Sequence, residues 1–182
     1  MKKFFVMAGL ASLLASCGNN ATKEESAAPA EKKEAGAKIE YPYTLDEPYA
    51  NWQPGDQQHV VTVMKALKGF ETGDIAACVA GFADSAELRF DQYRAKLSND
   101  SLKTFFANER GKYKDVKIKM GDWESVISED KKQEYVTLWY MQSWTDKSGK
   151  TDSVSVINDC KIVNGKIAML DEKMQRFPPA KK

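Results

Sequence analysis

Residues 154–177 read VSVINDCKIVNGKIAMLDEKMQRF, and this stretch decides the fold class. Apolar and polar side chains alternate on both sides of Asn164-Gly165, a dipeptide that favours the two-residue turn of a β-hairpin. Similar alternation occurs earlier, at 116–120 and 135–144. Together these segments predict four strands in an antiparallel meander, in which Gly121 marks a bulge that bends the sheet.

The chain before this meander has helical spacing in three places. Each predicted helix begins at a residue whose side chain can accept hydrogen bonds from the first turn, and two end at glycine. The predicted starts are Asp56, Asp74 and Ser98 or Asn99, and the predicted ends are Gly73, about Phe82 and Gly111. A short strand is expected around Leu88 and Phe90. Helices followed by antiparallel strands imply an α+β fold.

The first 16 residues have the features of a secretory leader. Lys2 and Lys3 precede an apolar run of about eleven residues, which is too short to span a bilayer. The motif Leu14-Ala15-Ser16-Cys17 resembles the lipobox of bacterial lipoproteins, and this resemblance implies cleavage before Cys17 and its lipidation. The alternative is an ordinary secretory leader followed by a chance cysteine. Lipidation would anchor the protein to a membrane of the bacterial cell envelope.

The segment after the leader separates this anchor from the domain. Residues 17–40 contain the cysteine and a linker rich in Ala, Lys, Glu and Pro, which cannot bury enough apolar surface to fold. Residues 41–55 contain several aromatic side chains and are expected to form an extended arm on the domain, which covers residues 56–182. Gly18, in place of Asp, favours an outer-membrane lipoprotein, either periplasmic or surface-exposed.

The order of these elements resembles the nuclear transport factor 2-like superfamily, particularly its SnoaL-like branch. The resemblance rests on residues 63–70, Thr72-Gly73-Asp74, Phe82-Ala83-Asp84 and Asn164-Gly165-Lys166-Ile167. It implies a cone in which three N-terminal helices pack on a curved, mainly antiparallel sheet and enclose a pocket. It implies no reaction, because the superfamily contains isomerases, cyclases, hydratases and noncatalytic binding domains.

Charge and residue counts exclude several classes of function. The chain has 27 Lys and Arg against 26 Asp and Glu, so we expect no nucleic-acid partner. His59 is the only histidine, and its place at the start of the first helix predicts a solvated side chain. Beyond Cys17 only Cys78 and Cys160 remain, so no metal site or cofactor is expected. These two cysteines could form a disulfide or stay as free buried thiols.

Aromatic side chains gather on the predicted strands. Trp123, Tyr140 and Trp144 are the candidate residues lining a ligand pocket. Trp139 and Met141 fall on the opposite face from Tyr140, so both faces of this strand are apolar. A second copy of the chain could cover the outer face of the sheet, as is frequent in the superfamily, or the arm could cover it.

Two functions are consistent with this sequence. The first is a noncatalytic, membrane-anchored domain that binds a small apolar ligand or an envelope protein. The second is a SnoaL-like isomerase, cyclase or hydratase, in which Asp171 acts as general base and Tyr140 donates a hydrogen bond. Asp122 and Asp159 are the other strand carboxylates considered. The acids that the SnoaL-like pattern leads one to expect are replaced here by Met169 and by Lys173-Met174-Gln175, which weakens the enzyme hypothesis.

Overall fold

The computed structural model describes residues 40–44 and 50–176. The leader, Cys17 and the linker up to residue 39 lie outside the described residues, as do residues 45–49 and 177–182. The chain divides into two units between Thr44 and Leu45, and the second, Leu45–Lys182, contains all the helices and strands described below.

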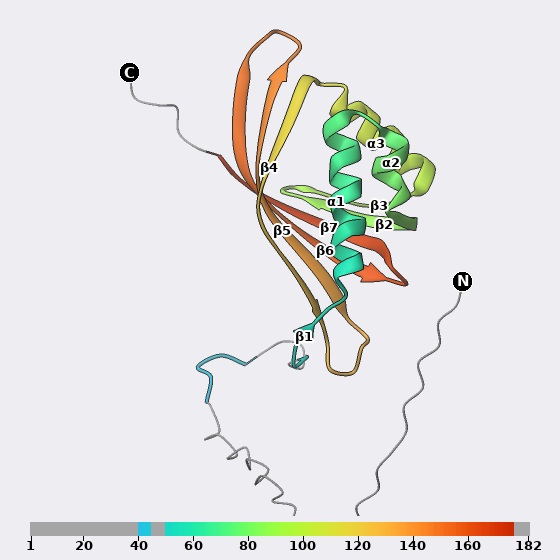
Figure 1. Cartoon of the computed structure of the whole chain (residues 1–182), viewed down its shortest axis with the longest axis vertical. Coiled ribbons are helices and arrows are strands. Elements are labelled where there is room, and N and C mark those ends of the chain that lie inside the picture. Colours follow the sequence, from blue (N-terminus) through green and yellow to red (C-terminus); the bar gives the residue numbers. More distant parts are fainter. Residues whose placement is uncertain (1–39, 45–49, 177–182) are drawn as a thin grey trace, which may run out of the picture. The chain divides into compact units, whose positions relative to one another are not determined.

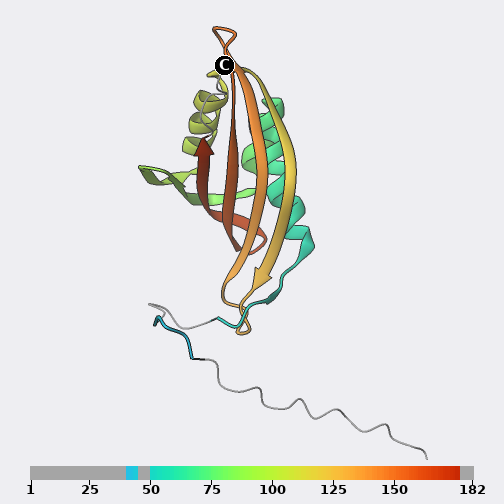
Figure 2. The same ribbon diagram turned by 90° about the vertical axis from the view of Figure 1, so that its left-hand side faces the viewer.

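The second unit is one layer of helices against a strongly bent sheet (Figure 1). The helices are α1 (Gln57–Thr72), α2 (Ile75–Ala80) and α3 (Asn99–Arg110). The sheet has seven strands in the order β1-β4-β5-β6-β7-β2-β3. Their bounds are β1 (Gln53–Pro54), β2 (Phe82–Phe90), β3 (Tyr93–Ser98), β4 (Tyr113–Ile127), β5 (Glu134–Asp146), β6 (Thr151–Val163) and β7 (Lys166–Arg176). Neighbouring strands are antiparallel except β2 and β7, and the convex face is seen in Figure 2. The α+β prediction with three helices on a curved sheet is therefore confirmed.

The helix ends follow the predicted capping chemistry. The side chain of Asp56 accepts a hydrogen bond from the Gln58 amide at 2.8 Å, and Asp74 and Ser98 cap α2 and α3 in the same way. Gly73 ends α1 in the left-handed region at φ 81°, where a residue without a side chain is favoured. Helix α2 ends at Ala80, earlier than predicted, because β2 begins at Phe82.

The strands also extend beyond their predicted ranges. The bulge predicted at Gly121 is present as a register shift between Met120 and Asp122, and the Asn164-Gly165 turn joins β6 to β7. The strand expected near residue 88 is present as β2, which begins earlier than predicted and continues through a turn at Asp91, with φ 45°, into β3. The sequence analysis did not predict β1 or β3, because the turn at Asp91 contains no glycine and β1 has only two residues.

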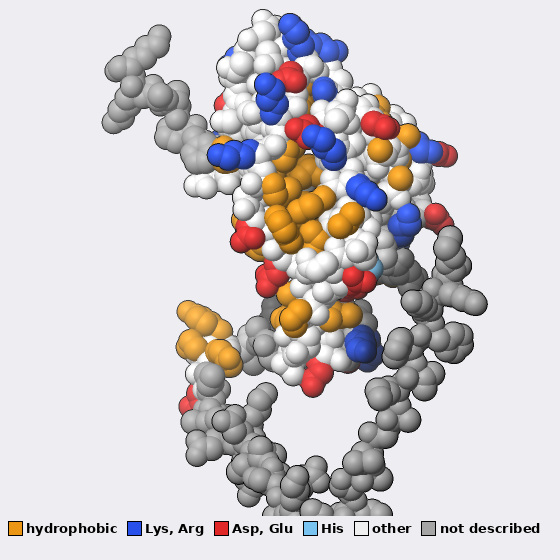
Figure 3. Space-filling model, viewed as in Figure 1, with side chains coloured by type: hydrophobic (Ala, Val, Ile, Leu, Met, Phe, Trp, Pro, Cys, Tyr) orange, Lys and Arg blue, Asp and Glu red, His pale blue; other side chains and the backbone are white. Residues whose placement is uncertain are grey.

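The core lies between the helices and the concave face of the sheet. Its fully buried side chains include Leu88, Leu102, Leu138 and Ile167. Gly69 brings α1 close to α2, since a Cβ at this position would lie 2.4 Å from the Cys78 amide nitrogen. Figure 3 shows apolar side chains gathered where α1 passes beside the sheet, so the core reaches the surface on this side.

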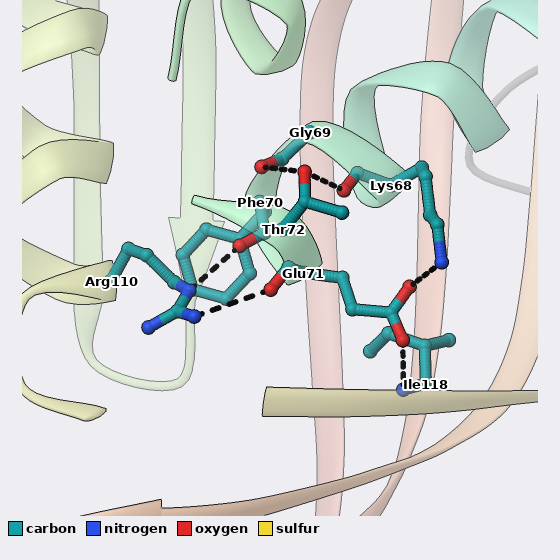
Figure 4. Close-up of polar contacts among 7 residues, drawn as sticks. All are labelled: Lys68, Gly69, Phe70, Glu71, Thr72, Arg110 and Ile118. Carbon is teal, nitrogen blue, oxygen red and sulfur yellow. Dashed lines mark hydrogen bonds and ion pairs between the residues drawn. The ribbon is translucent and has the colours of Figure 1, made fainter. Parts of the chain in front are cut away.

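Polar contacts hold the end of α1 in place between α3 and β4 (Figure 4). The Arg110 guanidinium donates to the Phe70 carbonyl at 3.0 Å and to the Glu71 carbonyl at 3.3 Å. The Glu71 carboxylate accepts from the Ile118 amide of β4 at 3.0 Å and from Lys68. Burial raises the pKa of Glu71, but these hydrogen bonds outweigh it, so the net pKa is lowered. Both α3 and β4 are thereby fixed to the last turn of α1.

Candidate ligand pocket in the cone

A cavity of about 550 Å³ lies between the helices and the concave face of the sheet. This volume falls within the roughly 300–1,000 Å³ usual for small-molecule sites. Its apolar lining comes from α1, α3 and the strands β2, β5, β6 and β7, and includes Leu67, Phe70, Phe82, Phe90, Phe105, Phe106, Leu170 and Met174.

The aromatic wall of the cavity is internally packed. The rings of Phe90 and Phe105 stack with centroids 5.6 Å apart, and Phe105 meets Phe106 edge to face at 5.4 Å. Phe82 and Phe70 also contact Phe106. Because ring pairs of this kind restrain one another, the wall is largely formed before any ligand enters.

Two of the three predicted lining residues face this cavity. Tyr140 and Trp144 line it, whereas Trp123 does not. Trp123 is paired with Leu138 in register and so lies on the concave side, but β4 is flanked on its outer side only by the short β1. Trp123 is therefore 48% exposed at the edge of the sheet. Its assignment to the pocket is corrected on this ground.

A polar stripe crosses the apolar wall along three adjacent strands. It consists of Tyr140 on β5, Asn158 on β6 and Glu172 on β7, all of which line the cavity. The Asn158 amide donates to the Tyr140 hydroxyl oxygen at 3.0 Å, and Asn158 lies directly opposite Glu172 in the β6–β7 register. Asn158 is only 5% exposed, yet its Oδ1 atom has no hydrogen-bond partner among the described residues. A buried acceptor of this kind is costly unless a ligand or water satisfies it.

The electrostatics of the stripe favour uncharged side chains. Burial, with a smaller contribution from the charge of Glu109, raises the pKa of Glu172 from 4.5 to about 7. Burial also raises the pKa of Tyr140 well above its ordinary value, and the Glu172 charge adds to this. Near neutral pH the carboxyl of Glu172 is therefore divided between its neutral and ionised forms.

Asp171, the predicted general base, does not reach the cavity. It follows the buried Leu170 and precedes Glu172, and side chains alternate along a strand, so it points to the convex face. There it is paired with Asp159 in register and forms an ion pair with Lys173 at 3.1 Å. The same alternation in the sequence could have identified Glu172, one residue further on, as the acid inside the cone.

The mouth of the cavity is charged. Lys112 donates to Glu109 at 2.7 Å, and both residues line the opening together with Arg176 and Tyr113. Burial raises the pKa of Tyr113, and the Glu109 charge adds to this effect. The cations therefore lie at the rim, whereas the polar stripe holds only Tyr140, Asn158 and Glu172.

The remaining candidate residues are the two cysteines and the histidine. Cys78 and Cys160 are free, buried thiols that line the cavity, which answers the open question of the disulfide in this structure. Burial raises the pKa of Cys78 to about 12 and raises that of Cys160 further. His59 is not solvated as expected, because its Nδ1 atom lies 2.5 Å from a carboxylate oxygen of Glu134 and both side chains are mostly buried.

Residues 40–44 and 50–176 contain neither a metal-binding cluster nor a membrane-spanning helix. No cluster of three or more His, Cys, Asp or Glu side chains in these ranges could hold a metal ion. No helix in them is long and apolar enough to cross a membrane.

Comparisons with known proteins identify the fold. No family model and no curated protein matches the sequence. An LEH-like epoxide hydrolase from M. tuberculosis has a similar structure, with a TM-score of 0.54 and 11% identity, over 68% of this chain and 82% of that one. AusH from Aspergillus nidulans also has a similar structure, with a TM-score of 0.54 and 16% identity, over 68% of this chain and 87% of that one. An NTF2-like protein of unknown function from Exiguobacterium sp. 255-15 matches with a TM-score of 0.51 and 17% identity, over 63% of this chain and 98% of that one. The domain therefore has the NTF2-like fold expected from the sequence.

Proposed function

We propose that this domain binds a small, mainly apolar molecule inside its cone and that it does so without chemical conversion. The observation that carries this proposal is the cavity itself, with its volume of about 550 Å³ and its wall of phenylalanine side chains. Burial of apolar ligand surface contributes roughly 25 cal/mol per Å², so such a wall supplies most of the affinity for an apolar molecule.

The proposal can be tested by ligand capture. The chain from residue 17 onward, carrying Cys17→Ser to prevent lipidation, is incubated with lipid and metabolite extracts, and retained species are identified by mass spectrometry. We expect an apolar species at about one per protein. A matched variant, Phe105→Arg, places a charge in the wall and should lose the ligand, while Trp123→Arg, outside the cavity, should keep it. Equal retention by both variants contradicts the proposal.

We further propose that the domain is held at the bacterial outer membrane by lipid on Cys17. The lipobox-like Leu14-Ala15-Ser16-Cys17 and the linker that follows support this location. Metabolic labelling with a fatty-acid analogue should modify the full-length protein and not Cys17→Ser. Unlabelled wild-type protein found in the soluble fraction contradicts the anchor.

We also propose that a second copy of the chain covers part of the convex face. Trp52 packs edge to face on Tyr135 at 5.7 Å and so covers one end of this face, whereas Trp139 and Met141 remain partly exposed beyond it. Light scattering should show a dimer that Trp139→Glu dissociates. A strict monomer at high concentration excludes it.

Acid–base catalysis is the second candidate function, and one observation favours it. Glu172, whose pKa is raised to about 7, occupies the cavity that Asp171 does not reach. A carboxyl with this pKa can accept or donate a proton near neutral pH. A captured ligand that changes in mass or, at unchanged mass, in chromatographic retention with wild-type protein, but not with Glu172→Gln, would establish this candidate in place of simple binding.

A further inference from the structure

The polar stripe of Tyr140, Asn158 and Glu172 carries an inference about the ligand's chemistry, which rests on the proposed binding function. In this stripe one hydrogen bond, from the Asn158 amide to the Tyr140 hydroxyl oxygen, leaves groups of both residues unused. The Oδ1 atom of Asn158 is a buried acceptor without a donor in residues 40–44 and 50–176. The hydroxyl hydrogen of Tyr140 has no acceptor among the described residues.

These unused groups match a ligand group that both donates and accepts a hydrogen bond. Amide oxygen and nitrogen can exchange places in Asn158 without changing its shape. In the exchanged orientation Tyr140 donates to the amide oxygen, and the amide hydrogens and the tyrosine oxygen are left unused. In both orientations the pair offers the ligand one donor and one acceptor. A hydroxyl group satisfies both at once, whereas an ammonium cannot accept and a carboxylate cannot donate.

The charges around the stripe disfavour an anion. Glu172 lies opposite Asn158 across the β6–β7 pair, and Glu109 from α3 is near enough to affect the pKa of Glu172. The other titratable groups whose charges act on the stripe are Cys160 and Tyr113, and burial raises the pKa of both, which keeps them neutral. Cys78, which lines the same cavity, is kept neutral in the same way. The cations of the cavity, Lys112 and Arg176, line the mouth, and Lys112 is engaged with Glu109. A carboxylate at the stripe would therefore meet no cation among the described residues at any pH, and once Glu172 ionises it would also meet like charge.

We propose that the stripe selects apolar molecules that carry a hydroxyl group on their buried part, such as long-chain alcohols or ring systems with a hydroxyl, over the corresponding carboxylates and amines. The apolar wall binds the body of the molecule, while Tyr140 and Asn158 bind the hydroxyl. The stripe thus supplies specificity, because a buried polar pair strongly rejects an analogue that leaves it unsatisfied.

The test compares three probes that differ only in their polar group: decanol, decanoate and decylamine. Each displaces the uncharged fluorescent probe phenylnaphthylamine from the chain carrying Cys17→Ser, at about pH 6, where Glu172 is largely neutral. We expect decanol to bind about tenfold more tightly than decanoate or decylamine, a factor that corresponds to about 1.4 kcal/mol. Decanoate or decylamine binding as tightly as decanol overturns the inference.

Variants assign the selectivity to the stripe. Tyr140→Phe and Asn158→Leu should each reduce the decanol preference about threefold to tenfold, measured as the ratio of decanol to decanoate affinity within the same variant, so that any change in phenylnaphthylamine affinity cancels. Tyr140→Phe removes a single oxygen and serves where Asn158→Leu does not fold. Arg176→Gln at the mouth is the matched control and should keep the preference. An unchanged preference in Tyr140→Phe contradicts the assignment.

The same experiment separates this inference from the proposed function. Failure of phenylnaphthylamine and all three decyl probes to bind contradicts the pocket itself. Binding of phenylnaphthylamine without discrimination among the decyl probes leaves the pocket in place and overturns only the selectivity for a hydroxyl group.

Discussion

Asp171 and Glu172 are adjacent in β7, but their side chains lie on opposite faces of the sheet. Asp171 forms an ion pair with Lys173 on the convex face, whereas Glu172 lines the cavity. Their different surroundings make them a matched pair for testing the electrostatics of the cone.

Replacing Glu172 should change how stability depends on pH. Its pKa is raised from 4.5 to about 7 on folding, so the folded protein binds the proton more tightly than the unfolded chain does. Stability is then greatest below about pH 4.5 and falls as the pH rises to about 7, by about 2–3 kcal/mol for this group. Glu172→Gln should remove most of this fall, and Asp171→Asn should retain it. Urea unfolding at about pH 5 and about pH 8 measures the difference, and parallel behaviour of the two variants contradicts the burial of Glu172.

The contact between Glu71 and Ile118 should stabilise the junction of α1 with β4. Glu71→Ala removes a charged acceptor from the Ile118 amide, so we expect a loss of about 2 kcal/mol in the free energy of unfolding. Hydrogen exchange should accelerate at the Ile118 amide. Lys68→Ala removes only the exposed ion-pair partner of Glu71 and should cost less than about 1 kcal/mol. Similar losses in both variants would show that the amide contact contributes little.

Gly69→Ala should destabilise the protein although alanine favours helices. A Cβ at Gly69 would lie 2.4 Å from the Cys78 nitrogen and 2.8 Å from the Asp74 carbonyl oxygen, so α1 and α2 must separate. We expect a net loss of about 2–3 kcal/mol, measured by urea unfolding, since overpacking outweighs the roughly 1 kcal/mol of helix propensity gained. Gly149→Ala is the control. It has φ 88° but no atom within 4 Å of the added Cβ, so its cost should be about 1 kcal/mol.

The thiols of Cys78 and Cys160 should be unreactive in the folded protein. Both are buried, and burial raises the pKa of each, which leaves little thiolate near neutral pH. Iodoacetamide should label them slowly under native conditions and rapidly in urea. Because free thiols gain no hydrogen on reduction, the intact mass without reducing agent should equal the mass after reduction. A shift of two hydrogens on reduction would show a disulfide instead.

Most of the fold could be predicted because local chemistry determines it. The caps at Asp56, Asp74 and Ser98 and the turn at Asn164-Gly165 act within a few residues, so their signals survive in the sequence. The hairpin at Asp91 and the pairing of β1 depend on contacts formed only in the folded protein, and these were missed.

The candidate site was predicted only in part, and the reason is geometric. Tyr140 and Trp144 were found because aromatic side chains on a predicted strand are visible in the sequence. Asn158 and Glu172 become a site only when β6 and β7 pair in the observed register. Trp123 was misplaced because the sequence does not reveal that β4 lies near the edge of the sheet, where a large ring stays exposed.

The hydrogen bond from the Ile118 amide to Glu71 has a consequence for self-association. An outer strand with unoccupied amide groups can pair with strands of other molecules and begin aggregation. On β4 the Ile118 amide is already occupied by a carboxylate of the same chain, and β1 pairs with the far end of the strand. Intermolecular β-pairing at these two places along β4 is thereby disfavoured.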